Sequence, residues 1–288
     1  MQAWARGNRA RKNVAAMKSN TQFAAYLTNG ETDPAKMNWD DSEESEAEDF
    51  SGCETSPEKQ LPDKSKYTGQ WKDQKKHGKG EQVWPDGAKY TGTFKNNAAH
   101  GYGEFVHAAG DKYEGHWKRD KAHGNGKFIH VDGSVYDGEW KNDLQHGKGT
   151  ELWNDSSKYE GEYLKGDKHG HGVYAWSDGS KYDGNWVANK IEGTGVYSWK
   201  DGREFSGDWL DNKMHGYGTY KWADGRRYEG EYLNDHKHGK GLYTYADGRQ
   251  YDGGWQNGRQ HGEGKHITTS GKFRMGVWNA GKREKWVD

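Results

Sequence analysis

A repeat of fixed length constrains this chain more than any other feature. Tyrosine or phenylalanine recurs every 23 residues, followed two positions later by glycine and four positions later by Trp, Phe or Tyr. A fixed internal period of this length indicates an array in which each unit packs mainly on its neighbours. Nine units run from residue 67 to residue 273, and a tenth starts at Arg274. They begin at Tyr67, Tyr90, Tyr113, Tyr136, Tyr159, Tyr182, Phe205, Tyr228 and Tyr251.

Two more signals keep the same period. His-Gly pairs recur with the histidine at positions 77, 100, 123, 146, 169, 215, 238 and 261, and Glu192 fills the one gap. Asp-Gly pairs follow, and their glycines suit turns that need a positive φ. Tyr-x-Gly-x-Trp and Gly-x-Gly-x-aromatic both alternate with period two, which predicts two short strands per unit. Each unit is therefore expected to be a hairpin, with a loop such as Lys141 to Gln145, giving roughly 18 to 20 strands in an antiparallel meander.

The two faces of the predicted sheet differ in composition. In the fourth unit Tyr136, Gly138 and Trp140 share one face, while Asp137 and Glu139 share the other. A glycine beside a ring removes the side chain that would block it, so we expect the rings to lie over glycines of adjacent strands. The expected fold class is all-β, an elongated and twisted single-layer array of antiparallel hairpins.

Composition supports a thin structure. Only 30% of the residues are hydrophobic and the mean hydropathy is −1.36, but 15 Trp and 18 Tyr supply rings for burial. A net charge of −1 gives no reason to expect nucleic-acid binding. Cys53 is the single cysteine, which excludes an internal disulfide and agrees with a reducing compartment. No apolar run approaches the roughly 18 residues of a membrane-spanning helix.

Residues 1–66 form an N-terminal extension without the repeat, and residues 67–288 form the repeat domain. The extension is expected to be irregular, with an acidic linker at residues 31–66 whose segment 40–49 is typical of a solvated spacer. Residues 1–30 contain no acid, which fits either a docking arm or a mitochondrial transit peptide. We expect this basic arm to contact protein partners through Arg6, Arg9, Arg11 and Lys12.

The residues of the repeat resemble a known family. Tyr-x-Gly-x-Trp, His-Gly-x-Gly and Asp-Gly on a 23-residue period are similar to the MORN (membrane occupation and recognition nexus) repeat. The departures are local: Glu192, Phe205, Ser156 and Arg274 replace the usual His, Tyr, Gly and Tyr. The resemblance implies a curved hairpin array that serves as a scaffold or recognition surface. Family members include junctional membrane tethers, lipid kinases, a histone methyltransferase, parasite cytoskeletal proteins and radial spoke head proteins of cilia.

No catalytic, metal or cofactor site is expected. Equivalent histidines of successive hairpins are two strands apart, about 9.6 Å, whereas zinc binds nitrogen at about 2.0 to 2.1 Å. The close pairs His169 with His171 and His236 with His238 lack a third ligand. Cys53 has no positioned base, and nearly every titratable group of the array has counterparts 23 residues away. Because the same groups recur in nearly every repeat, the sequence predicts a protein that is not an enzyme and that needs no cofactor.

The aromatic residues divide into two sets. Rings of the first strand, such as Trp117, Trp140, Trp186, Trp209 and Trp255, are expected to form the core. Rings at the end of the second strand lie near the Asp-Gly turns, where an open groove suits a partner helix or strand. The groove residues predicted to bind partners are Trp84, Trp153, Trp176, Trp199, Trp222 and Tyr245.

A basic rim at the same turns supports an alternative function. It suggests a phosphoinositide-binding or membrane-binding module at a contact site, although aspartates in these turns offset its charge. The rim consists of Lys89, Lys112, Lys158, Lys181, Arg203, Arg226, Arg227 and Arg249.

The leading functional prediction is a non-enzymatic scaffold or adaptor for protein partners. From the family resemblance we expect a cytoskeletal assembly, first the axoneme of a motile cilium or flagellum, with a location in the cytoplasm, cytoskeleton and cilium. The expected partners are other axonemal or cytoskeletal proteins, with weak acidic-lipid binding as an open alternative. A regulatory subunit of an enzyme whose catalytic part is another chain also remains open.

Overall fold

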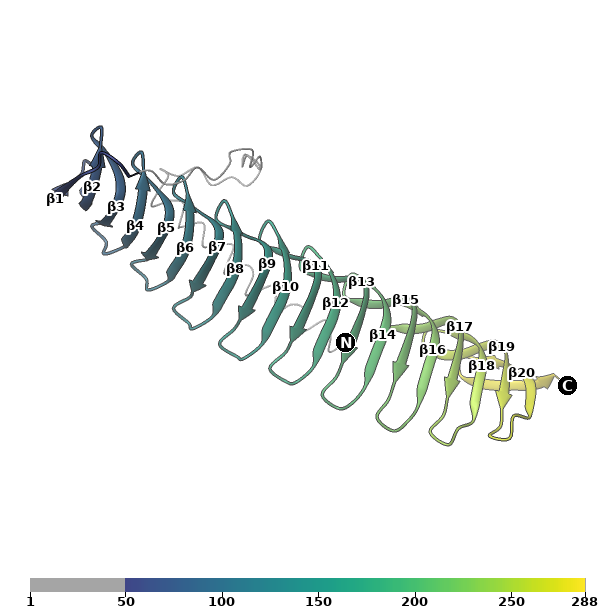
Figure 1. Ribbon diagram of the computed structural model, residues 1–288. Coiled ribbons are helices and arrows are strands. Elements are labelled where there is room, and N and C mark those ends of the chain that lie inside the picture. Colours follow the sequence, from purple (N-terminus) through teal and green to yellow (C-terminus); the bar gives the residue numbers. More distant parts are fainter. Residues whose placement is uncertain (1–49, 288) are drawn as a thin grey trace. The chain divides into compact units, whose positions relative to one another are not determined.

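The computed structural model of the protein describes residues 50–287. Every regular element in this range is a β-strand, and the 21 strands form an open antiparallel sheet of hairpin repeats (Figure 1). The chain divides into two compact units at the start of the eleventh strand. We call residues 50–167 the N-terminal unit and residues 168–287 the C-terminal unit.

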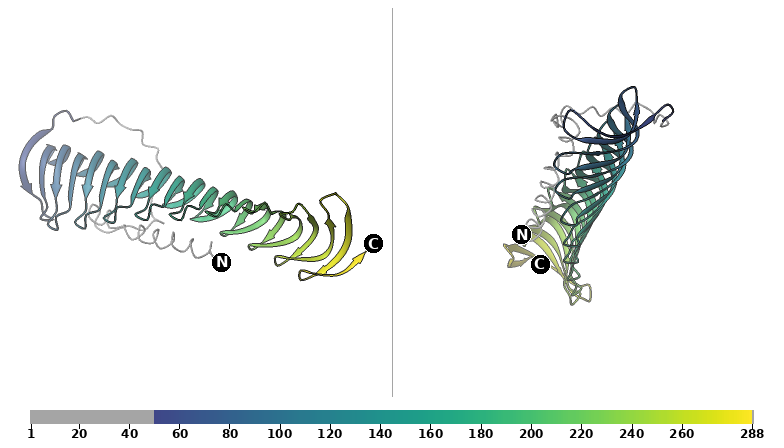
Figure 2. Two further views of the ribbon diagram at one scale, coloured as in Figure 1. Left: turned by 90° about the horizontal axis from the view of Figure 1, so that it is seen from below. Right: turned by 90° about the vertical axis from the view of Figure 1, so that its left-hand side faces the viewer.

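The strands of the N-terminal unit each pair with the next strand along the chain. Within the unit, successive strands rotate gradually, as expected from the twist of paired strands (Figure 2). The strands are β1 (Glu54–Gln60), β2 (Lys66–Lys72), β3 (Lys75–Val83), β4 (Lys89–Lys95), β5 (Ala98–Val106), β6 (Lys112–Lys118), β7 (Lys121–Ile129), β8 (Val135–Lys141), β9 (Leu144–Leu152) and β10 (Lys158–Leu164).

The C-terminal unit repeats the same pairing of consecutive strands. Its strands are β11 (Asp167–Ala175), β12 (Lys181–Val187), β13 (Lys190–Ser198), β14 (Glu204–Leu210), β15 (Lys213–Lys221), β16 (Arg227–Leu233), β17 (His236–Thr244), β18 (Gln250–Gln256), β19 (Arg259–Ile267), β20 (Phe273–Asn279) and β21 (Lys282–Val287).

Two kinds of turn connect the strands. At the hairpin end, Asn142 and Asp143 both have positive φ, 50° and 66°. These values are typical of a two-residue type I′ turn, so the loop is shorter than the five residues that the sequence suggested. At the other end Gly133 has φ 88°, and its N–H donates to the carbonyl of His130 at 2.9 Å. The prediction of a positive φ at the glycine of the Asp-Gly turn is confirmed.

The His-Gly motif forms a β-bulge. Gly138 pairs with Gly149, but the next paired residues are Trp140 and Gln145, so the second strand contains extra residues at this point. Gly147 takes φ 56° there, a conformation that glycine adopts without steric cost. In this repeat the Glu139 carboxylate accepts a hydrogen bond from the N–H of Lys148 at 2.8 Å and stabilises the bulge.

The core is a row of rings seated on glycines, as the sequence predicted. A Cβ atom added to Gly149 would lie 2.4 Å from the Tyr136 hydroxyl, and one added to Gly138 would lie 2.5 Å from the Cα of Gly149. Real Cβ atoms do not approach other atoms so closely, so both positions require glycine. The glycines therefore let the ring cover the backbone and give a single sheet its own buried layer.

The N-terminal extension differs from the irregular segment that the sequence suggested. Residues 54–60 form β1, which pairs with β2 and shifts register between Ser56 and Lys59, around Pro57. The strand lacks alternation of apolar and polar residues, so its pairing depends on the backbone of β2. Phe50 contacts His77, with ring centroids 6.3 Å apart. Residues 1–49, including the predicted contacts Arg6, Arg9, Arg11 and Lys12, lie outside the described residues.

Candidate protein-binding surface

The tyrosine that begins each repeat has a structural position. Tyr228 is buried, and its hydroxyl donates to the carbonyl of Glu231 at 3.0 Å. Its ring packs edge-on against Tyr232 and Trp255, with centroids 5.2 Å apart in both pairs. Burial raises the pKa of the equivalent Tyr67 to about 12, so the phenol stays neutral. These rings are enclosed within the sheet's own layer and are not the contact surface.

The second ring of each first strand is also structural. Trp255 is 6% exposed, and its indole N–H donates to the carbonyl of Gly241 at 3.0 Å. A buried indole with its donor satisfied contributes stability without needing a partner. Of the predicted core set, Trp117, Trp186, Trp209 and Trp255 are buried, whereas Trp140 is half-buried.

In the N-terminal unit the predicted groove does not form an open row of rings. Trp84 and Trp153 are buried, at 9% and 4% exposure. The two repeats between them have His107 and His130 at the equivalent positions. These two tryptophans are therefore part of the local core. The prediction of an open groove lined by exposed rings is wrong for the N-terminal unit.

In the C-terminal unit the remaining predicted residues form a continuous row. Trp176, Trp199, Trp222 and Tyr245 are half-buried and alternate with tyrosines that are buried. We call these eight residues the aromatic ladder. Its successive ring centroids are 4.5 Å apart for Tyr174–Trp176, 5.1 Å for Trp176–Tyr197, 4.5 Å for Tyr197–Trp199, 5.3 Å for Trp199–Tyr220, 4.4 Å for Tyr220–Trp222, 5.7 Å for Trp222–Tyr243 and 4.8 Å for Tyr243–Tyr245.

The four ladder tyrosines were not singled out from the sequence. They can be identified from the sequence because they stand two residues before the half-buried ring on the same strand and so lie on the same face of the sheet. Which rings of successive repeats come into contact depends on the register between paired strands, and the bulge shifts that register. These tyrosines are Tyr174, Tyr197, Tyr220 and Tyr243.

Arginines cover three of the four half-buried rings of the ladder. The Arg203 guanidinium lies 5.2 Å from the Trp199 ring centroid, and its Nε donates to Asp201 at 2.8 Å. Arg226 repeats this arrangement over Trp222 at 5.3 Å, and Arg249 does so over Tyr245 at 5.7 Å. Each such contact adds a cation–π attraction, so the arginine rigidifies the ladder from the turn side.

The basic rim at these turns is neutralised by ion pairs. The bond from Arg226 to Asp224 is 2.7 Å long, and this arginine holds the pKa of Asp224 below its usual value. All eight residues of the predicted rim have an acidic partner. The pairs are Lys89–Glu81, Lys112–Glu104, Lys158–Glu160, Lys181–Asp183, Arg203–Asp201, Arg226–Asp224, Arg227–Glu229 and Arg249–Asp247.

One cation beside the ladder differs from the rim. Lys237, on β17, lies on the ring-bearing face opposite Tyr232. Its Nζ is 4.3 Å from the ring centroid of Trp255, 4.7 Å from Tyr243, 5.4 Å from Tyr228 and 5.7 Å from Trp222. Burial, and then the charge of Arg226, lower the pKa of Lys237 to about 8.

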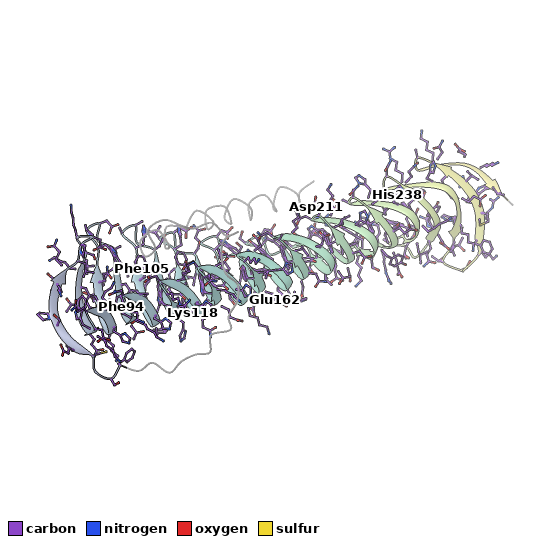
Figure 3. The ribbon with its side chains drawn as sticks, turned by 90° about the horizontal axis from the view of Figure 1, so that it is seen from above. Phe94, Phe105, Lys118, Glu162, Asp211 and His238 are labelled. Carbon is purple, nitrogen blue, oxygen red and sulfur yellow. The ribbon has the colours of Figure 1, made fainter. Side chains whose placement is uncertain are left out.

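A second row of side chains lies at the hairpin ends of the first strands. In the C-terminal unit it consists of Val187, Leu210 and Leu233, which are 41–46% exposed. In the N-terminal unit four of the five equivalent residues are lysines, among them Lys118, which Figure 3 labels at the end of β6, and the fifth is Leu164, 41% exposed. The four lysines are Lys72, Lys95, Lys118 and Lys141.

Other kinds of site find no support in residues 50–287. No group of three or more His, Cys, Asp or Glu residues in this range is placed to hold a metal ion. A helix long and apolar enough to cross a membrane is likewise absent from this range.

Comparisons with known proteins identify the repeat. The model of the family described as the MORN repeat matches nine consecutive segments, at residues 67–89, 90–112, 113–135, 136–158, 159–181, 182–202, 205–226, 228–248 and 251–273. No curated protein matches the chain.

Solved structures give only distant similarities. The CPAP G-box domain is 13% identical with a TM-score of 0.35, and the match covers 68% of this chain and 97% of that chain. The TCP10 domain of Danio rerio CPAP is 11% identical with a TM-score of 0.28, over 81% and 99%. Virginiamycin B lyase from Staphylococcus aureus is 9% identical with a TM-score of 0.16, over 78% and 84%. Superpositions this poor carry no functional argument.

Proposed function

Because the chain belongs to the MORN repeat family, we propose that it is a non-enzymatic scaffold that binds protein partners through the aromatic ladder of its C-terminal unit. MORN repeats suggest a protein-interaction or membrane-association module, and proteins built from them are generally non-enzymatic. The observation that carries the proposal is the row of half-buried rings from Trp176 to Tyr245, on a face whose other rings are mostly buried.

The chemistry of this row suits a protein partner. Tryptophan and tyrosine dominate the energetics of protein interfaces because each buries a large, rigid surface. Equivalent rings recur every second strand, about 9.6 Å apart. Side chains seven residues apart on an α-helix are about 10.5 Å apart. A partner helix lying along the ladder would therefore contact successive rings with one side chain per heptad.

A double variant tests the binding surface. Trp199→Ala with Trp222→Ala removes two adjacent half-buried rings while leaving the glycine-seated tyrosines in place. Partners captured with the tagged wild-type chain should be lost with this variant and retained with Val131→Ala, which truncates an apolar side chain that is 63% exposed in the other unit. Unchanged capture by the double variant, with retained folding, would contradict the proposal.

We place this scaffold in a cytoskeletal assembly, first the axoneme of a motile cilium or flagellum. The support is the family resemblance to radial spoke head proteins and parasite cytoskeletal proteins. The expected result is that the chain stays with axonemes after a high-salt wash. A chain that spreads through the cytosol after detergent extraction and is absent from cilia would remove this location.

The ion pairing of the rim favours this function over phosphoinositide binding. A surface that captures anionic headgroups needs a local excess of positive charge, but each of the eight rim cations lies beside an acid that offsets its charge. Sedimentation with vesicles containing phosphoinositide should show no salt-sensitive binding. Strong binding that salt abolishes would instead support the membrane function.

A further inference from the structure

Lys237 is half-buried against four rings and has no hydrogen-bond acceptor among residues 50–287. Its Nζ lies within 6 Å of four ring centroids, which attract it by cation–π contact alone. Among residues 50–287, no side chain accepts a hydrogen bond from it and no carboxylate pairs with it. Lys237 is half-buried, and an ammonium group has three N–H donors that the rings do not satisfy. Within residues 50–287 this positive charge at the ladder therefore has no acidic partner.

The equivalent lysine of the N-terminal unit shows how such a charge is satisfied. Lys76 occupies the same repeat position on β3 and donates to the side-chain carbonyl of Gln82. Six residues after Lys237 the chain has Tyr243 in place of that glutamine. A ladder ring stands in place of that acceptor, so within residues 50–287 the Lys237 ammonium has only ring contacts and is available to an acceptor from a partner.

The neighbouring charges select the kind of ligand. Arg226 and Lys237 both lie over the Trp222 ring, 5.3 Å and 5.7 Å from its centroid, so two positive charges meet here and an anionic guest is favoured over a cationic one. Arg226 is itself paired with Asp224. One uncompensated positive charge therefore remains, which matches a single carboxylate better than a phosphate dianion.

We propose that Lys237 binds the carboxylate of an aspartate or glutamate in the protein segment that lies along the aromatic ladder. This inference rests on the proposed function, because it takes the ladder as the binding surface and adds the chemistry of the occupant. Ile191, Met214 and Gln260 hold the same position in neighbouring repeats. Lys168 also holds it but is only 2% exposed, so Lys237 is the one half-buried lysine at this position among residues 168–287. The carboxylate consequently fixes the register of an otherwise repetitive ring surface.

The test uses Lys237→Met in the full chain. Methionine is compatible with this position, because Met214 occupies it opposite Trp209 as Lys237 does opposite Tyr232. The matched control is Lys240→Met, which removes the same charge from an exposed residue three positions later. Circular dichroism during heating checks that all variants remain folded.

The probe is a displayed library of random 12-residue peptides selected on each immobilised chain. The wild-type chain and Lys240→Met are expected to enrich peptides that combine apolar residues with one Asp or Glu. Lys237→Met is expected to lose the acidic preference while keeping the apolar one. For one selected peptide, its Glu→Gln version and Lys237→Met should each weaken binding by about tenfold, and the two together should weaken it little further.

The possible outcomes distinguish a failure of this inference from a failure of the proposed function. Acidic peptides that bind Lys237→Met and wild type equally would overturn the inference. So would wild-type selection of basic, neutral or phosphoserine-dependent peptides. If the selected peptides of any charge are still lost with Trp199→Ala and Trp222→Ala, the proposed function stands without the inference. Peptides unaffected by the ring variants would contradict both.

Discussion

The two units have the same repeat fold and differ in most repeats at two positions, the turn and the hairpin end. Both keep the tyrosine, the facing glycines and the bulge. At the turn, the N-terminal unit has small buried residues such as Ser134 and Ser157, and the C-terminal unit has Ser180 in its first repeat and then Arg203, Arg226 and Arg249. At the hairpin end, the lysines of the first four repeats are followed by Leu164, Val187, Leu210 and Leu233.

The turn position shows how one scaffold gives two surfaces. In the N-terminal unit Asp155 accepts from the N–H of Ser157 at 2.9 Å and also from its hydroxyl, and the serine is buried. In the C-terminal unit Asp201 accepts from the N–H of Arg203 at 3.3 Å and also from its guanidinium, which extends over Trp199. The aspartate closes the turn in both repeats, and in the second it also anchors a ring-covering arginine. The constant positions thus determine the fold, and the variable positions determine the surface.

The largest effect is expected at a constant position. Gly149→Ala and Gly241→Ala would place a Cβ 2.4 Å and 2.3 Å from the hydroxyls of Tyr136 and Tyr228. Each is expected to lower the free energy of unfolding by about 3 kcal/mol, measured by urea unfolding, because the ring must leave its seat. Gly225→Ala is the control: its Cβ meets nothing within 4 Å, so only the strain of φ 88° remains, about 1 kcal/mol. Unequal effects in the two units would contradict the claim that both units pack their rings on glycines in the same way.

The next effect separates the two units by function. Trp222→Ala in the C-terminal unit is expected to weaken partner binding by about 2 kcal/mol, because it removes a half-buried ring of the ladder. Trp153→Ala in the N-terminal unit is expected to leave binding unchanged and to lower stability, because that ring is only 4% exposed. Titration calorimetry with one purified partner and thermal unfolding measure the two quantities. The reverse assignment of effects would contradict the comparison.

A difference in pH dependence is expected at the hairpin turns. Burial raises the pKa of Asp143 to about 7 and that of Asp120 to about 6 in the N-terminal unit. In two repeats of the C-terminal unit the equivalent residues are Asn189 and Asn212, which do not titrate, and in the next repeat the residue is Asp235. Because the folded carboxyls bind protons more tightly than the unfolded ones, the free energy of unfolding falls as the pH rises from about 4 to about 7.

Replacing the carboxyl therefore sharpens this difference. Asp143→Asn keeps the oxygen that accepts from the N–H of Ala122 at 2.7 Å. It is expected to raise the free energy of unfolding by about 1 kcal/mol at pH 8 and to give little gain at pH 4. Urea unfolding at both pH values measures this change. An equal gain at the two values would show that the carboxylate charge is not the cause.

The smallest effect concerns a turn that has serine in place of the usual glycine. Ser156 has φ 68°, where the equivalent Gly179 has φ 88°. Ser156→Gly is expected to raise the free energy of unfolding by about 0.5 kcal/mol, since an L-residue pays a steric cost in this region. Gly179→Ser should lower it by a similar amount in the other unit. Urea unfolding of the pair checks the symmetry, and a loss of stability with Ser156→Gly would contradict it.

Much of this fold follows from the sequence, since the meander, the Asp-Gly turns and the rings over glycine come directly from period and alternation. Strand β1 was missed because residues 54–60 lack alternation and pair only through the backbone. The bulge at His-Gly was missed because two extra residues on one strand leave the 23-residue period unchanged. The bulge alters the register that brings Lys237 to Trp255, so that contact required the structure.

Radical footprinting of the tryptophans and tyrosines, in the purified complex with a partner, tests the central claim most directly. The account predicts that Trp176, Trp199, Trp222 and Tyr245 become protected from oxidation on binding. The half-buried Trp71 of the N-terminal unit should keep its reactivity. Protection confined to the N-terminal unit, with the four ladder rings unchanged, would contradict the account.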